Sequence, residues 1–190
     1  SAKGGVGKST VAINLAFALF ALLLIFRFLL QLVQADFFNP LSQAVLKTTA
    51  PVVEPLHKIC PTIRNLNTAA LMGAIISKWL YYWIILASGK LIYLGIGAHF
   101  LVAIFDVLGL VTEIYFWGIV IIALASWLQA LHHPHVRLIG EIVEPYLNPF
   151  RRIIPPIGIL DLSSMVAIIT LLMIQARILP LLKNIVLQFF

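Results

Sequence analysis

The sequence predicts an all-α integral membrane protein with four membrane-spanning helices, and its composition together with the pattern of apolar runs supports this fold class. Of the 190 residues, 62% are hydrophobic and only 11% are charged, whereas soluble domains carry about 25% charged residues. Long apolar runs recur along the chain, each close to the ~20 residues that a helix needs to cross a bilayer core. Polar, proline-bearing stretches unsuited to hydrocarbon separate these runs.

The predicted spans cover residues 10–34, 68–88, 110–130 and 162–182. Residues 1–9 precede the first span, and an apolar connecting segment, residues 89–106, precedes the third. Within this segment, residues 91–105 are apolar throughout but short for a span. A fifth crossing, a re-entrant or interfacial segment, and an extension of the following helix are all compatible with them.

The chain also reads as an internal duplication. A shift of 94 residues (134 − 40) aligns Pro40 with Pro134 and brings three further prolines into register, Pro51 with Pro145, Pro55 with Pro149 and Pro61 with Pro155. We therefore predict two repeats, residues 10–88 and 107–187, each built as span, interfacial segment and span. The interfacial segments are residues 36–67 and 131–161.

In both interfacial segments, prolines stiffen the backbone beside cationic and apolar side chains. Asn39 and Pro40 suit the N-cap and the first position of a short helix, which Pro51 is expected to stop or bend. Lys58 in one segment, and Arg151 with Arg152 in the other, follow a pair of prolines and adjoin isoleucines. Segments of this kind lie in the headgroup layer, with their cations toward anionic lipid.

The distribution of basic residues predicts which side of the membrane these segments face. Each segment carries three Lys or Arg, and the opposite side would carry Lys3, Lys8, Lys90 and Lys183. Because cytoplasmic loops are enriched in Lys and Arg, six against four favours a cytoplasmic position for both segments.

Residues 20–187 resemble the YggT family of small bacterial membrane proteins, which has cyanobacterial and plastid relatives. In the first repeat, the resemblance rests on Arg27, Asp36-Phe37-Phe38-Asn39-Pro40 and Ser42-Gln43. In the second repeat, it rests on Pro145, Pro149-Phe150-Arg151-Arg152, Pro155, Gly158 and Asp161-Leu162-Ser163. The first repeat departs from the pattern after Pro61, where Arg64 and Asn67 stand at the positions of Gly158 and Asp161.

The resemblance implies a multi-pass protein of the bacterial cytoplasmic (inner) membrane with no known enzymatic activity. It also implies links to osmotic tolerance, to potassium or ion homeostasis and to cell division or envelope organisation. In plastid relatives it implies a link to the assembly of membrane cytochrome complexes.

Charged residues within or beside the spans are the candidate polar sites, because charges in a bilayer are costly and mark functional positions by default. They are Lys78, Asp106, Glu113 and Arg177. Asp106 and Glu113 are seven residues apart, on one helical face, and can supply counter-charges to the two cations. Structural ion pairing and an ion path are the two alternatives. Arg27, near the end of the first span, either extends to the headgroups or pairs with Asp36.

The first nineteen residues resemble the deviant Walker A start of the ParA, MinD and Mrp group of ATPases. The matching residues are Lys3, Gly4, Gly5, Gly7, Lys8 and Ser9. A phosphate cradle also needs a strand before the loop, a parallel sheet and acidic residues that hold magnesium, none of which the sequence predicts. We therefore interpret this stretch as a remnant fused in phase with the first span, with nucleotide binding as the alternative.

These observations predict a non-enzymatic scaffold or assembly factor that supports the integrity of the envelope or of membrane complexes, and osmotic or ion tolerance. An ion channel or transporter component and a membrane-tethered nucleotide-binding protein are the alternatives. Pro134 interrupts the helical spacing of His132, His133 and His135, so we expect a turn there rather than a metal site, and we expect no cofactor. The expected partners are anionic headgroups and other membrane proteins, not nucleic acid; self-association is compatible with the sequence.

Overall fold

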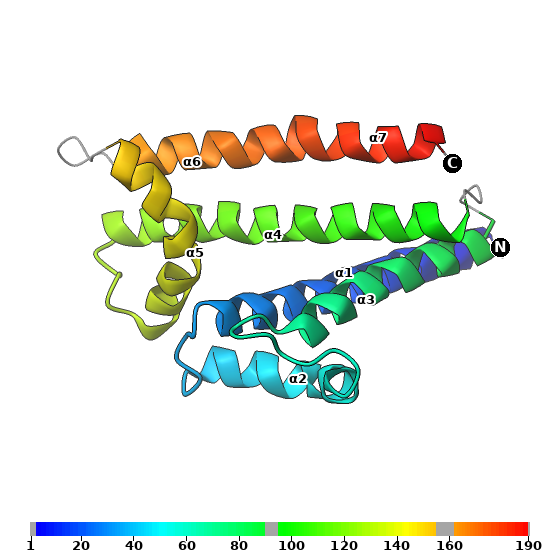
Figure 1. The fold of residues 1–190 in the computed structure, drawn as a ribbon, viewed down its shortest axis with the longest axis horizontal. Coiled ribbons are helices and arrows are strands. Elements are labelled where there is room, and N and C mark those ends of the chain that lie inside the picture. The colour runs from blue at the N-terminus through cyan, green and yellow to red at the C-terminus, as the bar shows by residue number, and fades with distance from the viewer. Residues whose placement is uncertain (1–2, 90–94, 155–161, 190) are drawn as a thin grey trace.

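The computed structural model describes residues 3–89, 95–154 and 162–189, and these form helices joined by short connections (Figure 1). Their order is α1 (Lys3–Leu32), α2 (Pro40–His57), α3 (Thr68–Ala87), α4 (Ile96–Trp127), α5 (Pro134–Ile153), α6 (Leu162–Met173), the π-helix η1 (Ile174–Ile178) and α7 (Leu179–Phe189). Four helical stretches are long and apolar enough to cross a bilayer: Val11–Leu32, Thr68–Ala87, Ile96–Trp127 and Leu162–Phe189. The predicted all-α membrane fold is confirmed.

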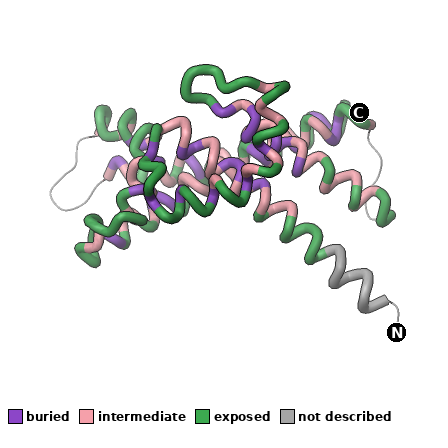
Figure 2. Tube along the Cα trace, turned by 90° about the horizontal axis from the view of Figure 1, so that it is seen from below, coloured by how far each residue is buried: buried purple, intermediate pink, exposed green. Residues whose placement is uncertain are grey.

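The spanning helices alternate in direction, so that α1 and α4 finish at the same end of the molecule and α2 and α5 begin there (Figure 1). The main core lies between α1 and α3, where Leu24 and Leu29 of α1 meet the small residues Ala70 and Ala74 of α3. Small residues allow two membrane helices to approach closely. Residues 11–16 of α1 are exposed and extend beyond this packed region (Figure 2).

A second, smaller core joins α4, α5 and α6 through Ile119, Val143, Leu147, Ala167 and Leu171. The Tyr146 hydroxyl of α5 donates to the carbonyl oxygen of Ala167 over 3.1 Å. Burial raises the pKa of Tyr146, so this hydroxyl stays protonated and remains a donor. The buried residues of α5 therefore form one face that holds this helix against the spans.

α4 settles the alternatives for residues 96–105. It is one 32-residue helix from Ile96 to Trp127, so residues 96–105 extend the third span instead of forming a separate crossing or a re-entrant segment. The predicted span, residues 110–130, began too late and ended slightly late. Gly95 stands at the N-cap with φ of 98°, a backbone conformation that suits glycine.

The last span is also longer than predicted. It runs from Leu162 to Phe189, whereas the prediction ended at residue 182. The π-helix Ile174–Ile178 lies in its middle, two residues before Pro180. Proline has no amide hydrogen and its ring clashes with the carbonyl four residues earlier, and a wider turn accommodates such a defect without ending the helix.

α2 begins as predicted but does not end at Pro51. Asn39 is the N-cap and Pro40 the first helical residue, and the helix continues through Pro51 and Pro55 to His57. Of the two expected effects of Pro51, a stop is therefore not observed, whereas a bend is visible: the first turns of α2 cross the view and the last are seen almost end-on (Figure 1). α5 similarly contains Pro145 and Pro149. The two helices begin at prolines 94 positions apart (134 − 40), as the duplication predicts.

The contact between α4 and α5 predicts the effect of one methyl group. A Cβ atom at Gly118 would lie 2.5 Å from Cγ1 of Val143, and a β-branched side chain in a helix has little freedom to move away. We expect Gly118→Ala to destabilise the protein by about 1–3 kcal/mol, the usual cost of overpacking. Thermal unfolding in detergent, followed by tryptophan fluorescence, measures this change.

Gly97→Ala is the matched control, because a Cβ atom at Gly97 would have no heavy atom within 4 Å. Alanine favours the helix over glycine by roughly 1 kcal/mol, so this variant should be at least as stable as the wild type. Equal stability of the Gly118 and Gly97 variants would contradict the close packing of α4 on α5.

Candidate functional site

The turn before α2 is built by the polar residues of the DFFNP stretch. An Oδ1 oxygen of Asp36 accepts a hydrogen bond from the amide of Phe38 over 2.9 Å. Oδ1 of Asn39 accepts from the amide of Leu41 over 2.9 Å and so caps the helix. Nε2 of Gln43 donates to the carbonyl oxygen of Phe37 over 2.6 Å. These bonds satisfy backbone groups that a proline-led helix start would leave without partners.

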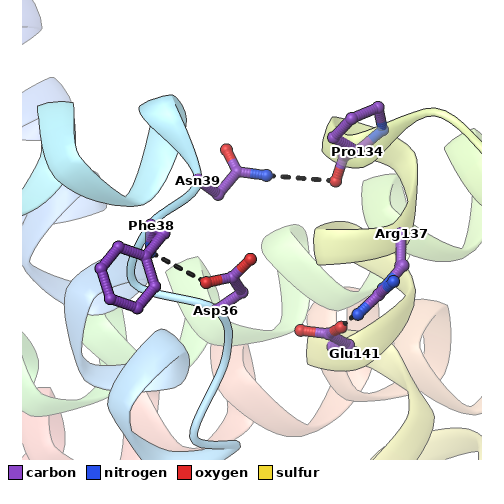
Figure 3. Close-up of polar contacts among 6 residues, drawn as sticks. All are labelled: Asp36, Phe38, Asn39, Pro134, Arg137 and Glu141. Atoms are coloured by element: carbon purple, nitrogen blue, oxygen red, sulfur yellow. Dashed lines mark hydrogen bonds and ion pairs between the residues drawn. The ribbon is translucent and has the colours of Figure 1, made fainter.

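Asn39 also connects the two halves of the chain. Its Nδ2 donates to the carbonyl oxygen of Pro134 over 3.2 Å, so the first turns of α2 and α5 meet (Figure 3). Asn39 is only 7% exposed, and its amide serves both helices at once. In the predicted duplication His133 corresponds to Asn39, yet as N-cap of α5 it makes no side-chain capping bond.

A small polar cavity of about 130 Å³ lies beside this contact, lined by Asp36, Asn39, His132, Pro134, Arg137, Leu138 and Glu141. On α5, the guanidinium of Arg137 pairs with a carboxylate oxygen of Glu141 over 3.2 Å (Figure 3). Asp36 enters the cavity from the α2 side. The cavity therefore brings two carboxylates and one guanidinium from both halves to one rim of the bundle.

Arg27 holds α2 against α1. Its Nη1 donates to the carbonyl oxygen of Leu46 over 3.2 Å and to Oγ1 of Thr49 over 3.0 Å. Thr49 is fully buried, and its hydroxyl donates a hydrogen bond to the carbonyl oxygen of Val45. Arg27 thus neither extends freely to the headgroups nor forms an ion pair with Asp36 in the described part of the chain. Instead, it ties the first span to the interfacial helix.

The ends of α2 and α5 expose cations next to apolar side chains. Lys58 is the C-cap of α2 and precedes Ile59, which is 78% exposed. Arg151 and Arg152 lie in the last turn of α5, before Ile153, which is 79% exposed. Cations near a helix C-terminus also complement its dipole. Of the other predicted residues, Pro51, Pro55, Pro61, Pro145 and Pro149 are exposed, and Pro155, Gly158 and Asp161 lie outside the described residues.

Three of the four predicted intramembrane charges share one polar cavity. It has a volume of about 290 Å³ and is lined by Lys78, Asp106, Gly109, Leu110, Glu113, Gln175, Leu179, Pro180 and Lys183. Asp106 forms an ion pair with Lys183 and accepts a hydrogen bond from the hydroxyl of Tyr82. Arg177 is exposed on η1 and lies apart from the residues that line the cavity.

Sequence reasoning missed Lys183 as a member of this site. We placed Lys183 on the membrane surface opposite the interfacial segments, because the predicted span ended before it. α7 continues to Phe189, so the ammonium of Lys183 reaches Asp106. Gln175 was also missed; its Nε2 donates to Oγ1 of Thr112 over 3.1 Å and joins the last span to α4. Gln175 and Lys183 are eight residues apart, which places them near one face of a continuous helix, and this spacing is the signal that could have found them.

The residues that resemble a phosphate-binding loop have a different backbone setting here. Residues 3–9 form the first turns of α1, which continues without interruption to Leu32. A fused remnant stays the prediction for this stretch, and nucleotide binding by Lys3, Gly4, Gly5, Gly7, Lys8 and Ser9 stays the alternative.

The spans and the two proline-bearing helices define the class as a multi-pass, all-helical membrane protein. The chain belongs to the CCB3/YggT family, whose model matches residues 9–88 and 101–182. The family resemblance predicted from the motifs is thereby confirmed, and residues 1–8 precede the matched region.

Relatives from three bacteria cover most of the chain. The uncharacterized protein PA0392 of Pseudomonas aeruginosa is 33% identical over 178 residues, covering 90% of this chain and 89% of the relative. An uncharacterized protein of Haemophilus influenzae is 34% identical over 168 residues, covering 85% and 86%. The uncharacterized protein YggT of Escherichia coli K12 is 26% identical over 174 residues, covering 92% and 90%. No solved structure matches the chain.

The two hydrogen-bonding roles of Asn39 can be separated by substitution. Asn39→Ser keeps a capping oxygen but removes the amide that donates to Pro134, whereas Asn39→Ala removes both functions. Because loss of an N-cap typically costs 0.5–2 kcal/mol, we expect the alanine variant to be less stable than the serine variant by about this amount. Thermal unfolding in detergent provides the comparison.

Both variants should also loosen the contact between α2 and α5. Spin labels on cysteines introduced at the exposed positions Lys47 and Glu144, in a background with Cys60 replaced by serine, report this distance. We expect a broader distance distribution in both variants than in the parent. An unchanged distribution in both would show that the bond from Asn39 to Pro134 does not hold the helices together.

Proposed function

We propose that this protein is a non-enzymatic membrane scaffold or assembly factor that acts through α2 and α5. In this role it supports the integrity of the envelope or of membrane complexes, and through them osmotic or ion tolerance. The observation that carries the proposal is the pair of short helices held at one rim of the bundle by the bond from Asn39 to Pro134. This bond joins the first turns of two helices that come from different halves of the chain.

The exposed side chains of α2, of α5 and of the turn before α2 suit the interface between water and lipid. Phe38 is 92% exposed, and the exposed isoleucines at the ends of α2 and α5 adjoin Lys58 and Arg152. Apolar side chains at this depth enter the boundary of the acyl chains, while neighbouring cations contact anionic headgroups. Because Lys183 lies in a span, the opposite side of the membrane carries one basic residue fewer than the sequence predicted. The Lys and Arg residues of the two interfacial segments therefore favour the cytoplasmic side of the bacterial inner membrane for these segments.

The internal anchors of α2 and α5 support a scaffold role. Arg27 fixes α2 to the first span, and Tyr146 fixes α5 to the last. Hydrogen bonds to the spanning helices keep the shape of this surface when a partner binds, and a rigid surface loses less conformational entropy on association. Anionic headgroups and another membrane protein are the proposed partners of this surface.

Charge reversal at the two helix ends tests the proposal. Lys58→Glu combined with Arg152→Glu replaces attraction to anionic headgroups by repulsion. In a bacterium that lacks its own copy, we expect this variant to accumulate in the membrane at the wild-type level and to fail to restore survival under hyperosmotic stress, because roughly 1 kcal/mol of headgroup attraction per cation is lost.

The conservative variant Lys58→Arg with Arg152→Lys is the control and should complement like the wild type, because the charge is retained. Immunoblots of the membrane fraction verify equal protein levels. If the charge-reversed protein complements fully at a normal level, the interfacial surface is not the functional one.

The polar cavity favours a second candidate, an ion channel or transporter component. Lys78, Asp106, Glu113 and Lys183 line a space of about 290 Å³ between spanning helices, and charged cavities at this depth mark ion paths in other membrane proteins. This candidate predicts potassium or proton flux through proteoliposomes, and loss of at least about tenfold in flux when Asp106→Asn and Lys183→Met remove one ion pair together. Flux equal to that of empty liposomes for the wild type would remove it.

A further inference from the structure

Lys78 and Glu113 lie at the middle of their spans. Lys78 is ten residues after Thr68 and nine before Ala87 in α3 (78 − 68 and 87 − 78). Glu113 is 17 residues after Ile96 and 14 before Trp127 in α4 (113 − 96 and 127 − 113). At 1.5 Å per residue, both side chains start roughly 13–25 Å from either helix end, which is near the centre of a hydrocarbon core about 30 Å thick.

The four charges of the polar cavity are unequally satisfied. Asp106 has Lys183 and the hydroxyl of Tyr82 as partners. By contrast, neither Lys78 nor Glu113 makes a hydrogen bond or an ion pair with any residue in the described ranges, although both line the same cavity. Within the described part of the chain, one cation and one anion therefore lack a partner at the depth where lipid can solvate neither.

The surroundings of Glu113 show that the chain leaves this face open. Glu113 is exposed, and Trp117 and Leu124, which follow it on the same side of α4, are 60% and 49% exposed. Although α4 packs against α1, α3, α5, α6 and α7, only 17% of its most apolar stretch is buried. A large apolar face thus surrounds two unpaired charges of opposite sign.

A second copy of the chain carries the two charges that this face lacks. In a two-fold symmetric dimer every contact occurs twice. If residue i of the first copy contacts residue j of the second, then residue j of the first copy contacts residue i of the second. A two-fold axis along the membrane normal also preserves depth, so ion pairs between copies require that the two partners lie at the same depth in one copy. Lys78 and Glu113 meet this requirement.

We infer that a second copy packs on the face formed by α3 and α4, so that Lys78 of each copy forms an ion pair with the partner's Glu113. The two ion pairs close the cavity laterally, and the exposed apolar side chains of α4 supply the surrounding contact. This interface is separate from the surface of α2 and α5, so its failure would leave the proposed scaffold surface standing.

Complementary charge reversal distinguishes pairing between copies from pairing within one chain. Lys78→Glu and Glu113→Lys are made in separate chains that carry different affinity tags. Each variant alone should show at least a tenfold lower dimer fraction than the wild type in lipid nanodiscs, because like charges then face each other twice. When the two variants are co-expressed, both pairs become complementary again, and mixed dimers should exceed homodimers several-fold instead of following the statistical ratio.

The control is Lys58→Glu, which makes the same charge change at the end of α2 and should leave the dimer fraction unchanged. A wild-type protein that is monomeric at all protein-to-lipid ratios overturns the inference, and so does a mixed fraction at the statistical ratio. If the single variants fail to accumulate, Lys78→Met with Glu113→Gln in one chain tests the same point without reversed charges. That variant should shift toward monomer, and a dimer fraction equal to the wild type also overturns the inference.

Discussion

A bilayer core offers no hydrogen-bond partners, and this constraint explains how the chain uses its few polar side chains. The backbone of each span satisfies itself by forming a helix. At the rim, Asp36, Asn39 and Gln43 bond to backbone groups of the turn before α2 and of its first residues, and Arg27 bonds to a carbonyl inside α2. Most side chains of the DFFNP stretch are therefore explained by the helix start that they complete. The ring of Phe38, in contrast, is 92% exposed.

Asn39 shows how one residue can serve both local and long-range structure. Its oxygen caps α2, while its nitrogen reaches the other half of the chain at Pro134. The corresponding residue in the second half, His133, makes no capping bond. If the halves descend from one ancestral unit, as the aligned prolines predict, then they have diverged: one half donates the connecting bond and the other accepts it.

The sequence was sufficient for features that depend on neighbouring residues. The positions of the spans follow from local apolarity, and the cap at Asn39 follows from side-chain chemistry next to a helix start. Pro51 does not stop α2, because a proline's local penalty can be offset by docking of the whole helix, here through Arg27 and buried Val53. Lys183 was misplaced for a related reason: its partner Asp106 is 77 residues away, and separation of this kind leaves no local trace.

The π-helix η1 sets the rotational phase of the last span. Ser163, Ala167, Leu171, Gln175, Leu179 and Lys183 recur every four residues, and several of them meet α4 directly, at Thr112, Gly109 and Asp106. In a regular helix each residue turns by about 100°, so a four-residue repeat drifts steadily around the axis and ends on the opposite side after five steps. The wider π turn takes up about one residue of that drift. Without it, the side chain of Lys183 would be turned by about a further 100° away from α4, and Asp106 would have to find its counter-charge elsewhere in the membrane.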